Sequence, residues 1–246
     1  MPRRPAVSDV KPDGRRQRAD GARSRQAILK AATELATIEG LDGLSIARLA
    51  EHVGMSKSGL FAHFKSKEDL QLATIDAAAE LFEREVTQPG MAAPAGLARV
   101  ESQCEAFFSY LERGVLQGGC FFVAAAAEFD AKPGPVKDHL GAVYSGILSA
   151  LTGAIREAQT MGELAATEDL AQLVFELDAL LLGANFAYAF FDDPAALERA
   201  RRGVRARLER ARPPAPGVKP SSSAGVRGPS SRRPASRRTP PAAGSR

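Results

Sequence analysis

The chain has 246 residues, enough for one large or two small globular units, and 44% of them are hydrophobic. That ordinary apolar fraction predicts that most of the chain can bury a core. The two cysteines, Cys104 and Cys120, form no CxxC pair. We therefore expect no disulfide scaffold, no zinc or other metal site, and a location in the reducing cytoplasm.

Basic residues gather at the two ends of the chain. Residues 1–25 contain eight Arg or Lys against three Asp, and residues 212–246 contain eight Arg or Lys and no acid. Because the whole chain carries +4, residues 26–211 carry a net charge of −9. Basic ends suit a polyanion such as DNA. For the C-terminal end, a solvated disordered tail is an equal alternative.

Neither targeting to a membrane nor a membrane partner is expected. No apolar stretch follows the Arg-rich N-terminus, so the sequence predicts no secretory signal. The longest nearly apolar stretch, residues 179–191, is interrupted by Asn185 and is shorter than a bilayer-spanning helix requires.

The sequence predicts an all-α fold between two irregular ends. Residues 1–21 lack periodicity and indicate a flexible basic arm, and the Pro/Ser/Arg-rich residues 212–246 indicate a disordered basic tail. Between them, apolar residues recur with the helical period. The first expected helix runs from Ser24 to Glu39 and ends before Gly40.

Two short helices are expected next, at residues 45–53 and 56–63. Ser45 and Ser56 are favourable N-caps, and Gly54 lies in the tight turn between the helices. Two short helices joined by a turn that contains glycine predict a helix-turn-helix packed on the preceding helix.

The remaining residues predict a larger helical domain. A helix capped by Ser66 is expected to end near Val86, before Pro89-Gly90. Five more helices are expected near residues 94–116, 121–130, 135–160, 167–191 and 194–211. The whole then has about nine helices, with a helix-turn-helix domain at residues 22–68 and a second helical domain at residues 69–211.

The second helix of a helix-turn-helix enters the major groove with its N-terminus first. Residues on its outward face need not pack, so they are free to contact DNA. N–H groups at the starts of helices also suit phosphate oxygens. The candidate residues on this helix are Ser56, Lys57, Ser58, Gly59, Phe61 and His63.

Several motifs in this region carry a family resemblance. They are Leu44-Ser45-Ile46, Val53-Gly54-Met55-Ser56-Lys57, Leu60-Phe61-Ala62-His63-Phe64 and Ser66-Lys67-Glu68-Asp69-Leu70, all within residues 23–72. Together they resemble the tetracycline-repressor (TetR) family. The resemblance implies backbone contact by Ser45, recognition-helix contacts by Ser56, Lys57, Ser58, Phe61 and His63, and phosphate binding by Lys67.

Two positions depart from the family pattern. Phe61 stands where the family often has a Tyr whose hydroxyl holds a phosphate, so Phe61 keeps only the aromatic packing. Arg48 stands where the family is often acidic, and we expect it to reach the DNA backbone.

The resemblance also implies partners. A family member binds a palindromic operator in double-stranded DNA as a homodimer, and a small-molecule effector bound by the helical domain usually relieves repression. No cofactor is expected. The sequence of the helix-turn-helix domain does not distinguish a repressor from an activator.

A cluster of aromatic residues and one thiol is the candidate effector cavity between the helices, with plain core packing as the alternative. Its members are Cys104, Phe107, Phe108, Phe121, Phe122 and Tyr144. Cys120 is a candidate redox sensor, but its aromatic neighbours favour a buried and inert thiol.

The last two expected helices have broad apolar faces, which the resemblance assigns to the dimer interface. The candidate interface residues are Leu173, Leu177, Leu181, Ala184, Tyr188, Val204 and Leu208. Glu176, Asp178 and Asn185 interrupt the first of these helices. A solvated edge is the default interpretation for them, with dimer register or a polar ligand group as alternatives.

Two other classes of function stay open. One is an enzyme or carrier built in the helical domain, against which stands the lack of GxSxG, GxGxxG, P-loop and HExxH motifs. The other is non-specific binding of nucleic acid through the basic ends. We expect a regulator and not an enzyme.

Overall fold

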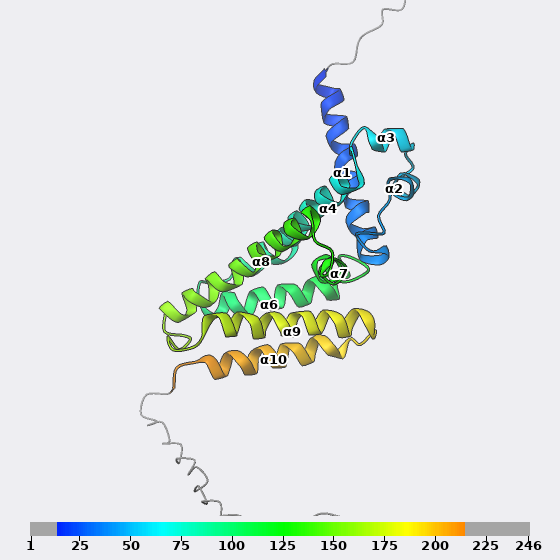
Figure 1. Cartoon of the computed structure of the whole chain (residues 1–246). Helices are drawn as coiled ribbons and strands as arrows, with labels where there is room; N and C mark the ends of the chain where they lie inside the picture. The colour runs from blue at the N-terminus through cyan, green and yellow to red at the C-terminus, as the bar shows by residue number, and fades with distance from the viewer. Residues whose placement is uncertain (1–13, 215–246) are drawn as a thin grey trace, which may run out of the picture. The chain divides into compact units, whose positions relative to one another are not determined.

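The computed structural model describes residues 14–214, with side chains from residue 19 onward, and all regular structure among them is helical (Figure 1). The all-α prediction is confirmed for this part of the chain. All nine expected helices are present there, with one short helix in addition. The expectations for residues 1–13 and 215–246 lie outside the described residues.

The N-terminal part consists of α1 (Gly14–Glu39), α2 (Ile46–His52) and α3 (Lys57–Phe61). Helix α1 begins ten residues before Ser24, so residues 14–21 of the expected flexible arm are helical. This segment lacks an apolar stripe but contains three Arg, one Gln and no Pro, which favours extension of an existing helix. Ile28, Leu49, Leu60 and Phe64 are fully buried where these helices meet.

Helix α4 (Lys67–Phe82) leads into a π-helical turn, η1 (Glu83–Thr87), and a short helix, α5 (Gln88–Met91). The prediction that helical structure stops before Pro89-Gly90 is therefore wrong. Pro89 lies in the first turn of α5, and the backbone oxygen of Glu85, four residues before it, accepts a hydrogen bond from the Arg113 guanidinium at 3.4 Å. Gly90 is buried against Gln103 of α6. The glycine therefore allows close contact between α5 and α6 and does not end the helix.

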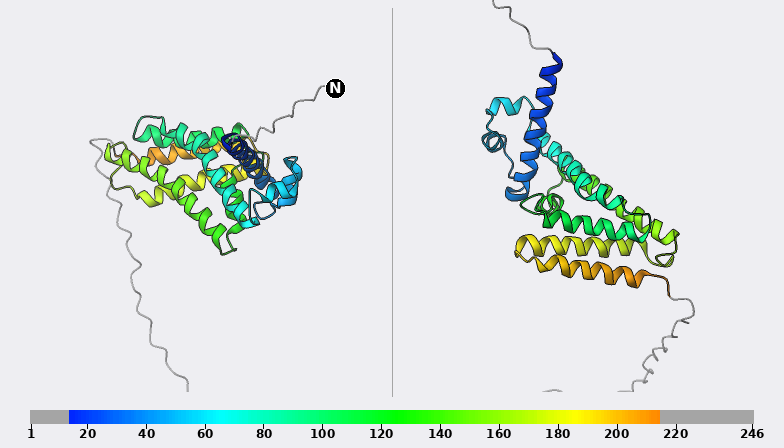
Figure 2. Two further views of the ribbon diagram at one scale, coloured as in Figure 1. Left: turned by 90° about the horizontal axis from the view of Figure 1, so that it is seen from above. Right: turned by 180° about the vertical axis from the view of Figure 1, so that it is seen from behind.

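The helical domain expected at residues 69–211 begins within α4 and continues with α6 (Leu97–Glu112), α7 (Phe121–Phe129), α8 (Pro135–Thr160), α9 (Leu170–Phe190) and α10 (Ala195–Ala211). Figures 1 and 2 show α9 and α10 running antiparallel along one side of α6. Arg201 of α10 binds Glu105 and Glu112 of α6, and Arg207 pairs with Glu176 of α9. These ion pairs fix α10 on the domain.

Helix α9 differs from its neighbours in being apolar on both faces. Over an 18-residue window its mean hydropathy is 1.5, so by length and composition alone it is long enough to cross a membrane. The expectation that this stretch is too short is therefore wrong. In the structure, however, Leu173, Leu177 and Ala184 are buried against neighbouring helices, and only the opposite face is exposed.

Candidate nucleic-acid interface and apolar cavity

Serine caps define the short helices of the N-terminal part. The Ser45 hydroxyl accepts a hydrogen bond from the backbone N–H of Arg48 at 3.2 Å, and Ser56 accepts one from Gly59 at 3.1 Å. Ser66 accepts one from Asp69 at 3.0 Å and begins α4. A five-residue helix such as α3 is not stable alone, so its cap and its buried Leu60 hold it in place.

The outward face of α3 carries a cation, a hydroxyl group and an aromatic ring. Lys57, Ser58 and Phe61 are exposed, with 55% of the Phe61 surface in solvent, whereas Gly59 and His63 are half-buried. In the described part of the chain, the Lys57 ammonium takes part in no hydrogen bond or ion pair. The first turn of α3 therefore presents an unengaged cation next to two hydroxyl groups.

Two other candidate cations are already engaged. The Arg48 guanidinium donates two hydrogen bonds to the carboxylate of Glu39, at 2.7 and 2.6 Å. The Lys67 ammonium donates to the backbone oxygen of Asp42 at 2.5 Å and to its carboxylate at 2.9 Å. Any contact of these two residues with phosphate must replace an intramolecular partner.

Asp42 joins the N-terminal helices to the second domain. Its carboxylate binds Lys67 of α4 and Lys132, which follows α7, at 2.9 and 3.1 Å. Its backbone N–H donates to Glu128 of α7 at 2.9 Å. The two lysines lower the pKa of the Asp42 carboxyl to about 2.

Arg25 performs a structural role in α1. Its guanidinium donates to the backbone oxygen of His63 at 2.7 Å and lies 4.4 Å from the centre of the Phe64 ring. Arg25 therefore ties α1 to the segment after α3.

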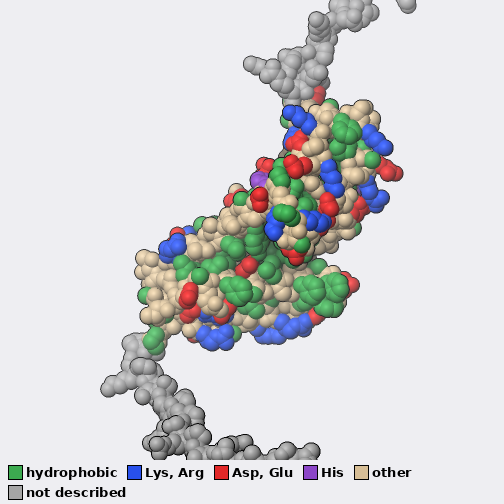
Figure 3. All heavy atoms as spheres, in the orientation of Figure 1, with side chains coloured by type: hydrophobic (Ala, Val, Ile, Leu, Met, Phe, Trp, Pro, Cys, Tyr) green, Lys and Arg blue, Asp and Glu red, His purple; other side chains and the backbone are tan. Residues whose placement is uncertain are grey.

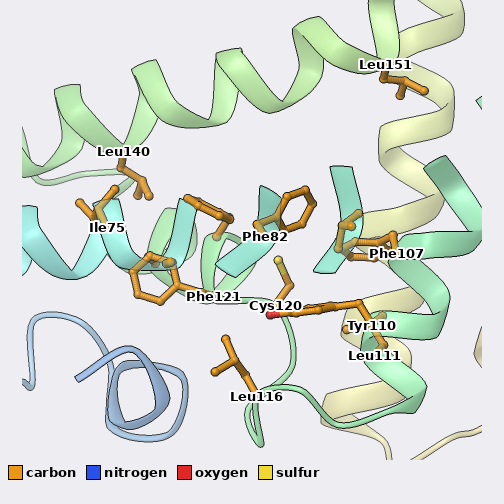
Figure 4. Close-up of a cluster of buried hydrophobic side chains, with 14 of the residues drawn as sticks. Ile75, Phe82, Phe107, Tyr110, Leu111, Leu116, Cys120, Phe121, Leu140 and Leu151 are labelled. Atoms are coloured by element: carbon orange, nitrogen blue, oxygen red, sulfur yellow. The ribbon is translucent and has the colours of Figure 1, made fainter. Parts of the chain in front are cut away.

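A cavity of about 60 Å³ lies where α4, η1, α6, α8 and α9 converge. Figure 4 shows part of its surroundings, with Phe82 of α4, Phe107 of α6 and Cys120 at the start of α7 close together. Most lining residues are apolar. The polar exceptions are Thr87, Gln103, Tyr144 and Asp178.

The polar part of the cavity centres on one hydrogen bond. The Tyr144 hydroxyl donates to the Asp178 carboxylate at 2.7 Å. Burial raises the pKa of Asp178, although the Tyr144 hydrogen bond acts in the opposite direction. Burial also raises the pKa of Tyr144, so its hydroxyl stays a donor.

The structure divides the six aromatic and thiol residues of the expected cavity into two groups. Cys104, Phe107 and Tyr144 line the cavity, whereas Phe108, Phe121 and Phe122 are buried and do not line it. The prediction for the latter three is corrected, because their rings pack in the core; Phe122, for example, meets Phe82 edge-on at 5.8 Å.

The sequence does not single out Asp178 as a cavity residue, because a charged residue that interrupts an apolar helix predicts a solvated edge. The same expectation is wrong for Asn185, which is 95% buried and accepts a hydrogen bond from the Cys120 N–H at 2.8 Å. Helical periodicity does not reveal these partners, since Tyr144 and Cys120 lie 34 and 65 positions away in the chain.

Two family comparisons cover most of the described chain. Residues 28–74 match the bacterial regulatory proteins of the tetR family, and residues 96–204 match the tetracyclin repressor-like C-terminal domain. The chain belongs to the TetR family. It is accordingly a DNA-binding transcriptional regulator that responds to a ligand, with a helix-turn-helix head (α1–α3) and a helical ligand-binding domain.

Individual TetR-family relatives agree with this assignment. The HTH-type transcriptional repressor BepR of Brucella suis biovar 1 (strain 1330) is 26% identical over 168 residues, 66% of this chain and 80% of BepR. The Escherichia coli tetracycline repressor protein class C is 41% identical over 56 residues, 23% of this chain and 24% of that repressor. A TetR transcriptional regulator from Chloroflexus aurantiacus J-10-fl has a TM-score of 0.70 at 25% identity, covering 78% of this chain and 96% of its own. TetR-family regulators are generally not enzymes.

Most of the residues expected at the TetR-type dimer interface face the interior of the protomer. Five of the seven are at most 4% exposed, and Leu181 and Tyr188 are half-buried. The prediction is wrong for these five, because a side chain enclosed by its own protomer cannot contact a second copy. They are Leu173, Leu177, Ala184, Val204 and Leu208.

The exposed face of α9 carries large aromatic side chains. Phe175, Phe186, Phe190 and the adjoining Phe191 are 54–69% exposed. The rings of Phe186 and Phe190 stack with their centres 5.1 Å apart, and Phe191 meets both edge-on. Figure 3 shows the hydrophobic patch over the C-terminal end of α9.

Both thiols are buried. Cys104 is 1% exposed and Cys120 is 2% exposed, and burial raises their pKa values to about 12 and about 11. The interpretation of Cys120 as a buried and inert thiol is therefore supported over that of a redox sensor.

Proposed function

We propose that this regulator is a cytoplasmic, homodimeric repressor that binds a palindromic operator and leaves it when a small molecule occupies the cavity. The observation that carries the operator-binding part is the outward face of α3. A capped helix with Lys57, Ser58 and Phe61 in solvent suits insertion into the major groove. The relatives named as repressors favour repression over activation.

The contacts with DNA divide into two kinds. Lys57 and Ser58 reach base edges from the first turn of α3, and Phe61 packs against the sugar-phosphate backbone. Ser45 and Ser56 offer hydroxyls and helix N-termini to phosphates. Gly59 and His63 contribute less because they are half-buried.

Arg48 and Lys67 bind phosphate only by exchanging partners. Each leaves a carboxylate, Glu39 or Asp42, when it turns toward DNA. Because these surface ion pairs contribute at most about 1 kcal/mol each, the exchange is energetically accessible.

The dimer uses the exposed face of α9 against a second copy of this chain. Phe186, Phe190 and Phe191 together leave roughly 400 Å² of aromatic surface in solvent, the size of a functional patch on a monomer. TetR-family membership makes a second copy the natural partner for this surface.

Selection of a binding site from random-sequence DNA by gel shift tests the proposed function. We expect one palindromic sequence to be enriched and to be preferred over random DNA at physiological salt. Enrichment of no sequence, together with loss of all DNA binding after removal of both basic ends, would mean non-specific electrostatic binding instead.

A further inference from the structure

The cavity described above is lined by one carboxyl group. Among the described residues that line it, Asp178 is the one charged side chain, and no Lys, Arg or His is present. Its other walls include Phe82, Phe107 and Leu181, so an apolar molecule finds aromatic and aliphatic contacts on several sides.

The Asp178 carboxylate is short of partners. Tyr144 donates one hydrogen bond to Oδ1, and the described part of the chain supplies no salt bridge to Asp178. Burial removes water from the Asp178 carboxylate, and one hydrogen bond from a neutral donor replaces only part of the lost hydration. A ligand that brings a positively charged donor would therefore gain a charge-assisted hydrogen bond.

The surface next to the cavity is negatively charged, like Asp178 inside it. One groove, between α4 and α8, shares Phe82 and Thr87 with the cavity and carries Glu80 and Glu83. A second groove, between α8 and α9, shares Asp178 and carries Asp169. No described basic residue lines either groove, so the approach to the cavity favours cations over anions.

The size of the cavity limits the ligand. Its volume of about 60 Å³ is smaller than the roughly 150 Å³ at which an engineered apolar cavity holds benzene. A ligand with one ring must therefore displace side chains, and a much larger one would have to open the domain. Phe82 and Val86 lie on the wall, so this displacement moves the junction of α4 and η1.

We propose that the effector is a compact, mainly apolar amine that binds as its ammonium cation beside Asp178. This inference rests on the proposed function, which makes the cavity the effector site. The ammonium group donates to Asp178, Tyr144 keeps its own hydrogen bond to Oδ1, and the apolar part of the ligand packs between Phe82, Phe107 and Leu181.

Three probes of one size and different charge test the ligand class on the full-length protein. Isothermal titration calorimetry with benzylamine, benzyl alcohol and benzoate at neutral pH should give the tightest binding for benzylamine. We expect at least roughly tenfold preference over benzyl alcohol, the scale of one hydrogen bond to a charged group, and no measurable binding of benzoate. Equal or tighter binding of benzyl alcohol or benzoate, or no binding of benzylamine, overturns the proposal.

The variant Asp178→Asn tests whether the preference for benzylamine comes from the Asp178 carboxylate. Asparagine keeps an acceptor for Tyr144 and nearly the same volume, so we expect roughly tenfold weaker benzylamine binding and unchanged benzyl alcohol binding. The control is Asp138→Asn, which removes an exposed carboxylate of α8 that lines neither the cavity nor the two grooves. Unchanged benzylamine affinity in folded Asp178→Asn contradicts the proposal. If that variant does not fold, the three-probe comparison on the unaltered protein decides.

The two proposals fail in different measurements. Benzylamine binding is measured without DNA, and operator binding is measured without benzylamine. If benzylamine binds at Asp178 but no DNA sequence is preferred, the regulatory function is wrong and the amine site stands. If an operator is found and bound but benzylamine is not, the ligand class is wrong and the regulatory function stands.

Discussion

Lys57 lies in the first turn of α3, is exposed, and forms no side-chain hydrogen bond or ion pair with the described residues. In this helix, different residues stabilise the fold and face the DNA. Ser56 and Leu60 hold the helix, while Lys57 and Ser58 face outward. Substitutions at the outward positions therefore separate DNA binding from folding.

Lys57→Ala should weaken binding to the selected operator by roughly tenfold or more, because it removes a contact from the major groove. Fluorescence anisotropy with operator and with random DNA measures the effect, and the loss should be larger for the operator. Arg156→Ala, which removes an exposed cation of α8 that forms no ion pair among the described residues, is the control. Unchanged operator affinity for Lys57→Ala removes this residue from the interface.

Asp42 predicts a pH effect on stability. Its pKa falls from 3.8 to about 2 in the folded chain, so its ion pairs stabilise the fold above pH 3.8, and this contribution is lost as the pH falls toward 2. Asp42→Asn should lower the free energy of unfolding at pH 7 by less than about 1 kcal/mol, since the pairs are solvent-exposed.

Urea unfolding of both proteins between pH 7 and pH 2 measures this difference. It should shrink below pH 3.8 and be small at pH 2, where half of the folded-state carboxyls are protonated. Glu101→Gln removes an exposed carboxylate of α6 that forms no ion pair in the described residues, and it should show no such profile. A difference at pH 2 that equals the difference at pH 7 means that the charge of Asp42 is not the cause.

At the scale of elements, the contact between α5 and α6 depends on one glycine. A Cβ atom at Gly90 would lie 2.7 Å from Cγ and 2.8 Å from Cα of Gln103. Gly90→Ala should therefore lower the free energy of unfolding by about 1–3 kcal/mol. Chemical denaturation checks this value, and a stability equal to that of the unaltered chain would show that α5 moves aside at little cost.

Gly141→Ala is the opposite case on α8. No heavy atom lies within 4 Å of the position of its added Cβ. Alanine loses less conformational entropy than glycine on folding, so this variant should gain about 0.5–1 kcal/mol. A loss of stability in the same denaturation experiment would contradict the open surroundings of this site.

The DNA-binding head could be predicted closely because its signals are local. Ser45, Ser56 and Ser66 each bond to the N–H three residues ahead, which a sequence pattern captures. The junction after α4 could not be predicted. A π-helical turn leaves no clear mark in the sequence, and Pro89-Gly90 indicated a stop although the chain remains helical there.

The faces of α9 could not be assigned from the sequence because apolar residues surround the helix. Periodicity finds a stripe through Leu173 and Leu177, but it finds another through Phe175 and Phe186. Only the packing of α10, α8 and α6 against α9 decides which stripe is internal. The same holds for Asp178, whose partner Tyr144 comes from another helix.

At the scale of the whole molecule, Phe186→Asp should convert the proposed dimer to monomers, because it places two charges in the apolar interface proposed for α9. Analytical ultracentrifugation measures the change, and operator affinity should fall with it since half-sites are then bound one at a time. The melting temperature of the unaltered protein should also rise with protein concentration.

Met161→Asp is the control for this substitution. Met161 is 57% exposed, close to the 54% of Phe186, but it lies at the C-terminal end of α8. It should leave the dimer intact. A Phe186→Asp protein that sediments as a dimer places the interface elsewhere.

The exposed face of α9 has bulky residues toward its ends and small ones at its middle, in the order Phe175, Ala179, Gly183 and Phe186. Under a two-fold axis, the Phe175 end of one copy meets the Phe186 end of the other, and the small residues meet each other. A related helix without this order would clash or leave a gap. In the proposed dimer this face would therefore sort subunits, so regulators that share a cell and a similar DNA-binding head should not exchange chains or bind hybrid operators.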